Sequence, residues 1–211
     1  MTQAGASRDA LLLVSGGPWK NVRVRSPQTL SEADRRIVAL WAADCAERVV
    51  GLFEAEAPGD SRPREAIART RAFARGELDV ADEIRRRFVN GGAAREVRAP
   101  SAVAAARAAG QAAAVAHMGA HALGAAAYAA KATGFAALDR PDAVREELCW
   151  QLSHMSVAVK AALRLLPPVG ENSSGPLGPG LLASGLLGTI VRDLQAGLTD
   201  RDHVLTAGHM T

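Results

Sequence analysis

Aromatic residues are scarce in this chain of 211 residues: they make up 4%, as four Phe, three Trp and one Tyr. Hydrophobic residues still reach 48% and charged residues 22%, which is typical of a globular protein. Ala, Leu and Val must therefore fill the interior. Small side chains let helices approach closely and do not build the roomy core of a β-barrel. The length is sufficient for one domain with a hydrophobic core.

Motifs of the common enzyme classes are also missing. The sequence has no glycine-rich phosphate loop, nucleophile elbow, CxxC pair or paired-carboxylate motif. Ser15-Gly16-Gly17 is too short and too early in the chain to form a phosphate loop. No reaction is therefore identified by motif.

Cysteine is limited to Cys45 and Cys149. The apolar run at 10–14 is too short for the core of a signal peptide and lacks a basic n-region. We therefore expect a cytoplasmic protein in which both thiols are reduced. The apolar neighbours of each cysteine predict that it serves as a small side chain of the core.

Charge is mildly basic, with a formal net charge of +3, and the two signs are interleaved. The densest basic run, 85–87, follows three acidic residues, and only Phe88 could stack on a base. We interpret it as a solvated helix face and expect no nucleic-acid partner. Residues 111–130 carry no formal charge, but Ala and Gly dominate them. A buried helix is therefore favoured over a membrane span.

Helical spacing of apolar residues begins after Ser31, which with Asp34 resembles a capping box. One stripe recurs every four residues and predicts an amphipathic helix to about residue 57; it contains Ile37, Trp41, Cys45, Val49 and Phe53. Trp41 lies on this stripe, so we assign it to the core. Trp150 is expected to pack likewise, and Trp19 to pin the N-terminal arm to the bundle.

Proline, glycine and capping residues divide the rest of the chain into further helices. The predicted helices lie at about 61–75, 79–90, 100–134, 139–166 and 181–194. The stretch 101–137 has 20 Ala among 37 residues, with Arg107 and Lys131 as its only charges, and should occupy the centre.

The predicted fold is an all-α bundle of five to seven helices, with a short α-solenoid as the alternative. We divide the chain into an N-terminal arm at 1–29, a helical domain at 30–166, and a Gly/Pro linker with a C-terminal helix and tail at 167–211. Short extended segments are expected in the arm at 10–14 and 22–24.

Three segments stand in the order and spacing of a known family: Leu40–Val49 (LWAADCAERV), Arg62–Ile67 (RPREAI) and Ala116–Tyr128 (AHMGAHALGAAAY). Over about residues 30–166 the chain resembles the all-helical immunity proteins of bacterial polymorphic toxin systems. The resemblance implies a helical fold and a function in binding and neutralising a cognate toxin. The segments 1–29 and 167–211 have no counterpart in that resemblance, and added elements can give a bundle another function.

Asp44 and Arg48 lie four residues apart on the first predicted helix, the spacing at which side chains meet. We expect an ion pair between them. Such a pair is more often structural than part of a site, and it becomes a polar anchor when another helix buries it.

His117 and His121 are also four apart, in a stretch with few polar groups. Two imidazoles at this spacing can bind one metal ion if Asp44, Glu47 or His154 supplies a third ligand. Because that ligand is not fixed by the sequence, the favoured interpretation is that each His donates a hydrogen bond inside the bundle. We therefore predict no metal and no cofactor.

The same residues allow acid–base chemistry without a metal. If His117, His121, Asp44, Arg48 and Tyr128 converge on a cavity, they form a candidate catalytic group for a small molecule. The leading prediction is a non-enzymatic immunity-like protein that binds a toxin. A small biosynthetic enzyme is the alternative, and a metal-dependent or DNA-associated factor is a third class. A homodimer is compatible with the small-residue helix faces.

Overall fold

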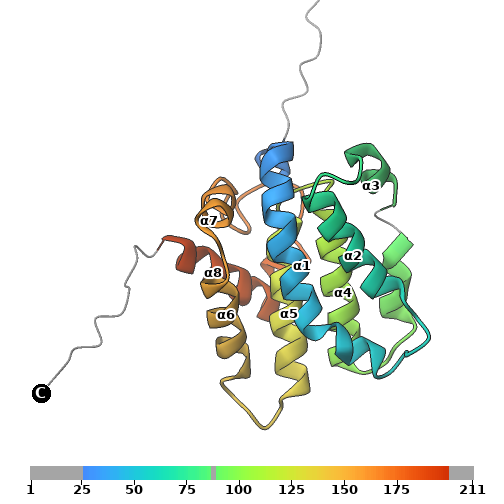
Figure 1. Ribbon diagram of the computed structural model, residues 1–211. Helices are drawn as coiled ribbons and strands as arrows, with labels where there is room; N and C mark the ends of the chain where they lie inside the picture. The colour runs from blue at the N-terminus through green and yellow to red at the C-terminus, as the bar shows by residue number, and fades with distance from the viewer. Residues whose placement is uncertain (1–25, 87–88, 200–211) are drawn as a thin grey trace, which may run out of the picture.

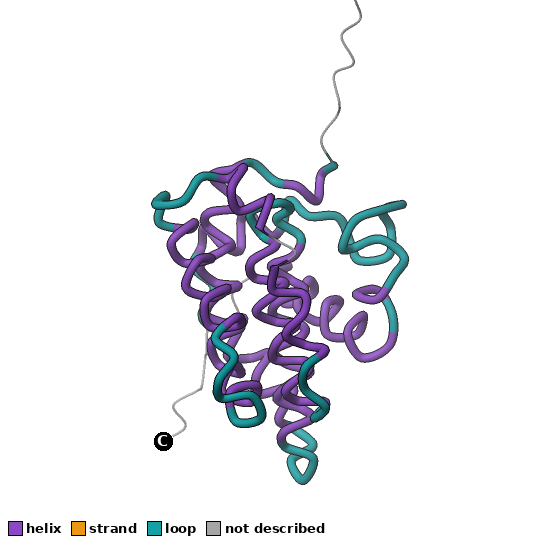
Figure 2. The backbone as a smooth tube through the Cα atoms, turned by 90° about the vertical axis from the view of Figure 1, so that its right-hand side faces the viewer, coloured by secondary structure: helices purple, strands orange, loops and turns teal. Residues whose placement is uncertain are grey.

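A computed structural model of the protein describes residues 26–86 and 89–199, and all regular structure in these residues is helical. Figure 2 shows helices joined by loops, with no strand in the described part of the chain. The α-helices are α1 (Glu32–Glu54), α2 (Arg62–Ala74), α3 (Val80–Arg86), α4 (Pro100–Ala114), α5 (His121–Ala136), α6 (Ala143–Ser153), α7 (Val157–Leu163) and α8 (Gly185–Thr199). Three 3₁₀ helices accompany them: η1 (Pro27–Thr29), η2 (Val89–Arg95) and η3 (Leu181–Ala183). The predicted all-α bundle is confirmed.

The helix α1 begins where the capping residues predict. The hydroxyl of Ser31 accepts a hydrogen bond from the Asp34 amide at 3.0 Å, which satisfies one free donor of the first turn. The predicted stripe is buried from Trp41 to Phe53, whereas Ile37 is 37% exposed. Trp41 is 2% exposed, so its assignment to the core is confirmed.

The Ala-rich stretch forms two helices, α4 and α5, where the sequence predicts one. Between them, the amides of Gly119 and Ala120 donate to the carbonyls of Thr29 and Gln28, each at 3.0 Å. Gly119 lies so close to Leu30 that an added Cβ would overlap that side chain. The segment before α1 therefore fixes the break, because it uses the amides that a continuous helix would need.

A second break divides the helix predicted at 139–166 into α6 and α7. The hydroxyl of Ser156 caps α7 by accepting from the Val159 amide at 3.2 Å. These two breaks explain why eight α-helices are present in the described residues where five to seven are predicted.

The helices α4 and α5 contribute mainly Ala side chains to the core, and the larger core side chains come mostly from the helices around them. Both helices pack against each other and against α1, with α2 on one side of α1 and α6 and α7 on the other (Figure 1). No helix within 26–86 or 89–199 is long and apolar enough to span a membrane.

The residues at 170–180 are held by one buried glutamine. Gln28 is fully buried, its amide nitrogen donates to the Ser174 carbonyl at 2.5 Å, and its amide oxygen accepts from the Leu177 amide at 2.9 Å. The helix α8 then packs against α5. The segments expected at 10–14 and 22–24, together with Trp19 and Phe88, lie outside the described residues.

Candidate functional site

The outward face of α1 is tied to α2 by ion pairs. Arg71 donates to Asp44 at 2.8 Å and to Glu47 at 3.0 Å, and Arg64 reaches Glu47 at 2.8 Å. Partial burial opposes the charge on Arg71, but the hydrogen bonds to Asp44 and then Glu47 raise the pKa of this guanidinium above its ordinary value. These contacts fix how α2 lies against α1.

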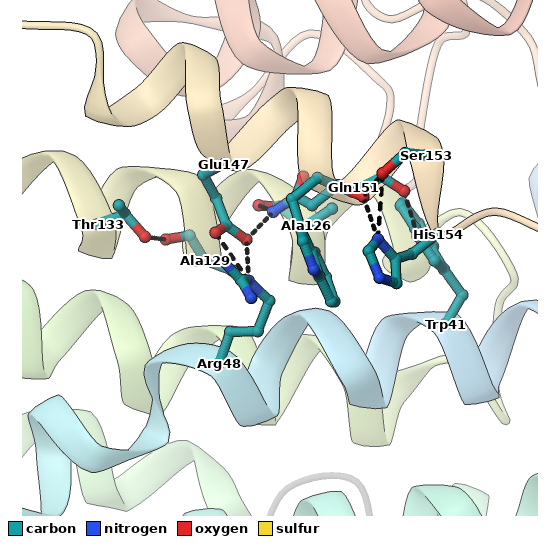
Figure 3. A network of polar contacts seen from close by, with 10 residues as sticks. Trp41, Arg48, Ala126, Ala129, Thr133, Glu147, Gln151, Ser153 and His154 are labelled. Carbon is teal, nitrogen blue, oxygen red and sulfur yellow. Dashed lines mark hydrogen bonds and ion pairs between the residues drawn. The ribbon is translucent and has the colours of Figure 1, made fainter.

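Arg48 points to the other side of α1 and binds Glu147 of α6 (Figure 3). Its Nε atom lies 2.8 Å from one Glu147 carboxylate oxygen and 3.1 Å from the other. The predicted pair between Asp44 and Arg48 is therefore wrong. The two side chains diverge because partners on two flanking helices, Arg71 on α2 and Glu147 on α6, lie within reach.

Glu147 belongs to a buried polar network that joins α1, α5 and α6 (Figure 3). Gln151 is fully buried and donates to Glu147 at 3.0 Å and to the Ala126 carbonyl of α5 at 3.1 Å. The indole of Trp41 donates to the Gln151 carbonyl at 3.0 Å. Sequence analysis missed Glu147. Its position four residues before Gln151, on the inward face of the same helix, could have indicated a buried polar pair.

Trp150 lies at the surface edge of this network, where the sequence predicts a core residue. It is partly buried, and the Arg48 guanidinium carbon lies 3.8 Å from the centre of its ring. His154 stacks on the same indole with ring centres 4.0 Å apart, and its Nδ1 lies 2.8 Å from the Trp150 carbonyl. Arg48, Trp150 and His154 thus form a stack in which every member already has a partner.

The two cysteines differ in environment. Cys45 is buried, and burial followed by the nearby carboxylates of Glu147 and Asp44 raises the pKa of this thiol well above 9.0. Cys149 is exposed, so its predicted place in the core is wrong. It lies on the outward side of α6, two positions after the buried Glu147. Neither thiol forms a disulfide.

The two histidines do not share a helix. His117 lies in the turn after α4, whereas His121 is the first residue of α5. The premise that four residues of continuous helix place both imidazoles on one face is therefore wrong. The Nδ1 atom of His121 lies 2.8 Å from the amide oxygen of Gln111 on α4.

A metal ion on the same histidines would need a third ligand nearby. Within residues 26–86 and 89–199, no three His, Cys, Asp or Glu side chains are grouped closely enough to hold a metal ion. Two of the proposed third ligands, Asp44 and Glu47, bind Arg71, and the third, His154, stacks on Trp150.

Tyr128 faces a groove between α4 and α5 with a volume of about 140 Å³. The ring is 3% exposed, and the Arg107 guanidinium carbon lies 5.8 Å from its centre. On α5, the same helix as Tyr128, the Lys131 amine lies 5.5 Å from the centre of the Phe135 ring. Arg107 and Lys131 are the only charges of the Ala-rich stretch, but their positions in the sequence do not predict that they line one groove.

The five candidate catalytic residues occupy two regions of the fold. Asp44 and Arg48 lie on α1 and bind residues of α2 and α6. His117, His121 and Tyr128 lie in or after the turn that leads into α5, and Tyr128 is two helical turns, about 10 Å, beyond His121. The described contacts therefore place Asp44 and Arg48 on a surface of paired charges. Tyr128 lies beside a groove whose two cations, Arg107 and Lys131, form no ion pair in the described residues.

Comparison with known protein families places the chain among immunity proteins. The model of the family described as "Imm-5 like putative immunity protein" matches residues 28–158, from η1 to the second residue of α7. No curated protein and no solved structure matches the chain significantly. The match spans more than half of the 211 residues and includes the three segments that carry the resemblance. The chain belongs to the Imm-5 like immunity protein family.

Proposed function

We propose that the protein is an immunity protein that binds a cognate toxin and neutralises it by contact, without chemistry of its own. The observation that carries the proposal is the family match, because residues 28–158 include α1 to α6 and hence both surfaces described above. The close-packed Ala core and the ion pairs between α1 and α2 support a rigid shape. A rigid surface favours binding because it loses little conformational entropy when the complex forms.

The enzyme alternative requires its polar groups around one cavity. Asp44 and Arg48 are engaged on either side of α1, and Tyr128 faces a groove of about 140 Å³. Pockets for small-molecule substrates are usually about 300–1,000 Å³. The candidate catalytic residues therefore do not gather around a cavity of that size, which favours recognition of a protein surface over turnover of a small molecule by these residues.

The test is co-expression with the product of a toxin gene that lies beside this gene. We expect this protein to restore growth of a bacterium that expresses the toxin, compared with an empty vector. The purified pair should elute from size exclusion as one complex, and this protein alone in the same run reports whether it forms a homodimer. Unchanged toxicity together with separate elution would reject the proposal.

A further inference from the structure

The groove between α4 and α5 is lined by one face of each helix. On α4 the lining residues are spaced three and four apart, and on α5 three and four apart as well, so each set forms a continuous stripe. The lining residues are Pro100, Val103, Ala104, Arg107, Tyr128, Lys131 and Phe135. The groove is therefore mainly apolar, and each helix contributes one cation to it.

Neither cation has a carboxylate partner. Arg107 and Lys131 form no ion pair with any residue in 26–86 or 89–199, although twelve other ion pairs are present there. The sequence explains this, because no acidic residue occurs from 97 to 138. Glu56, which meets the start of α4, is engaged by the backbone amides of Arg98 and Ala99 at 2.7 and 3.0 Å.

The size of the groove limits what it can hold. A volume of about 140 Å³ is too small for a nucleotide or a typical cofactor, whose pockets are about 300–1,000 Å³, and suits a single side chain. The rings of Tyr128 and Phe135 provide apolar walls for a methylene stem. The two cations provide the partners for a negatively charged end.

We propose that this groove binds an Asp or Glu side chain that a partner protein presents. The inference rests on the proposed function and adds the chemistry by which the toxin is recognised. Two cations are too few for a nucleic-acid backbone, which needs a basic stripe, and too few for an anionic membrane, which needs about four to eight. Arg and Tyr are among the residues that most often carry the binding energy of protein interfaces, and both line this groove.

The first test uses a blocked amino acid in place of the unidentified partner. The full chain is titrated with N-acetyl-glutamate N-methylamide, and the NMR signals of Arg107 and Lys131 are followed. We expect saturable shifts with a dissociation constant in the millimolar range, and no saturation with the corresponding glutamine compound. In the variants the backbone amide signals of Val103, Tyr128 and Phe135, which also line the groove, are followed. The double variant Arg107→Met/Lys131→Met should lose these shifts, whereas Arg140→Met, which removes an exposed arginine of the loop before α6, should keep them.

Three results of this titration would overturn the inference. They are an absence of shifts in the groove, an equal response to the glutamine compound, and tighter binding of inorganic phosphate than of the glutamate compound. The last result would identify the ligand as a phosphate. A thermal melt of each variant, expected to lie near that of the wild type, shows that a lost response reflects the groove.

The second test uses the co-expressed toxin. The charge reversals Arg107→Glu and Lys131→Glu together should abolish growth rescue, and Arg140→Glu should leave it intact. Rescue by the groove variant would overturn the inference while the proposed function stands. If the wild type itself gives no rescue, the proposed function fails, and the glutamate titration still decides whether the groove binds a carboxylate.

Discussion

Arg48 and Arg107 make the same type of contact in two regions of the fold, with different surroundings. Both guanidinium groups lie over an aromatic ring, Arg48 at 3.8 Å from Trp150 and Arg107 at 5.8 Å from Tyr128. Arg48 also binds the buried carboxylate of Glu147, whereas Arg107 has no ion-pair partner among the described residues. A cation over an aromatic ring therefore does not identify a binding site by itself. A cation that also has a carboxylate partner within the fold is structural, whereas a cation without one can bind an external anion.

The difference follows from the composition of the neighbouring helices. The helix α6 places Glu147 and Gln151 four residues apart on the side that meets α1 and α5. The helices α4 and α5 offer mainly Ala to each other, so they pack closely and provide no counter-charge for their cations. Substitutions at one residue of each region test whether the counter-charge accounts for the difference.

The largest effect is expected for Arg48→Met. The variant keeps an apolar stem but leaves the Glu147 carboxylate, whose side chain is 2% exposed, without its cation. Removing one partner of a buried pair is strongly destabilising, so we expect a loss of about 3 kcal/mol in the free energy of unfolding, the low end of the range because Arg48 is partly exposed. Urea unfolding measures this loss.

The control for that variant is Arg140→Met, which removes one member of the exposed pair between Arg140 and Glu146. Surface pairs contribute little, and we expect a change within about 0.5 kcal/mol. Equal losses in the two variants would mean that Glu147 is hydrated in the folded protein and that the network does not lock α6 to α1.

The next effect concerns the turn that separates α4 from α5. In Gly119→Ala the new methyl group would overlap Leu30, and we expect a loss of about 2 kcal/mol from overpacking. Gly110 lies within α4 with open space around its Cβ position, so Gly110→Ala should stabilise by about 0.5–1 kcal/mol. If both variants are stabilised, Leu30 does not pack tightly against the turn at Gly119.

The fold could be predicted from the sequence where local signals agree. Ser31 capped α1 as expected, and the stripe from Trp41 to Phe53 is buried, because a four-residue period and a capping residue act within one helix. Gly110, Gly119 and Gly124 each permit a bend in the Ala-rich stretch, but the sequence does not tell which of them the chain uses. The break at Gly119 depends on the carbonyls of Gln28 and Thr29, about ninety positions away, and the local spacing of residues does not reveal this contact.

The candidate site was predicted less well, for the same reason. Spacing placed Asp44 beside Arg48 and His117 beside His121, but it cannot show which flanking helix supplies a better partner. In the structure Asp44 binds Arg71 and Arg48 binds Glu147. The break before α5 leaves His117 outside the helix that begins at His121. Side-chain pairing between helices depends on the tertiary structure. The sequence could therefore point to these polar residues but not to the residues that they bind.

A smaller effect is expected from Cys45 and depends on pH. Burial, followed by the carboxylates of Glu147 and Asp44, raises the pKa of this thiol above the ordinary 9.0, so the folded protein keeps a proton that the unfolded chain loses. The stabilisation is complete below pH 9 and decreases as pH rises, by about 1 kcal/mol between pH 9 and pH 10. In Cys45→Ala this decrease should vanish from the pH dependence of unfolding. Cys149→Ala, at an exposed thiol, should keep it; the same slope in all three proteins would show that water reaches Cys45.

The smallest effect is expected for Arg107→Met, and it completes the comparison with Arg48. The substitution removes a weak contact with the Tyr128 ring and leaves no buried carboxylate without its cation. We expect the free energy of unfolding to change by no more than about 0.5 kcal/mol in the same urea experiment. A loss close to that of Arg48→Met would contradict the comparison, because it would mean that the folded protein uses Arg107 for its own stability. A near-zero change, together with a lost response to the glutamate compound, would show that the charge at Arg107 serves binding and contributes little to folding.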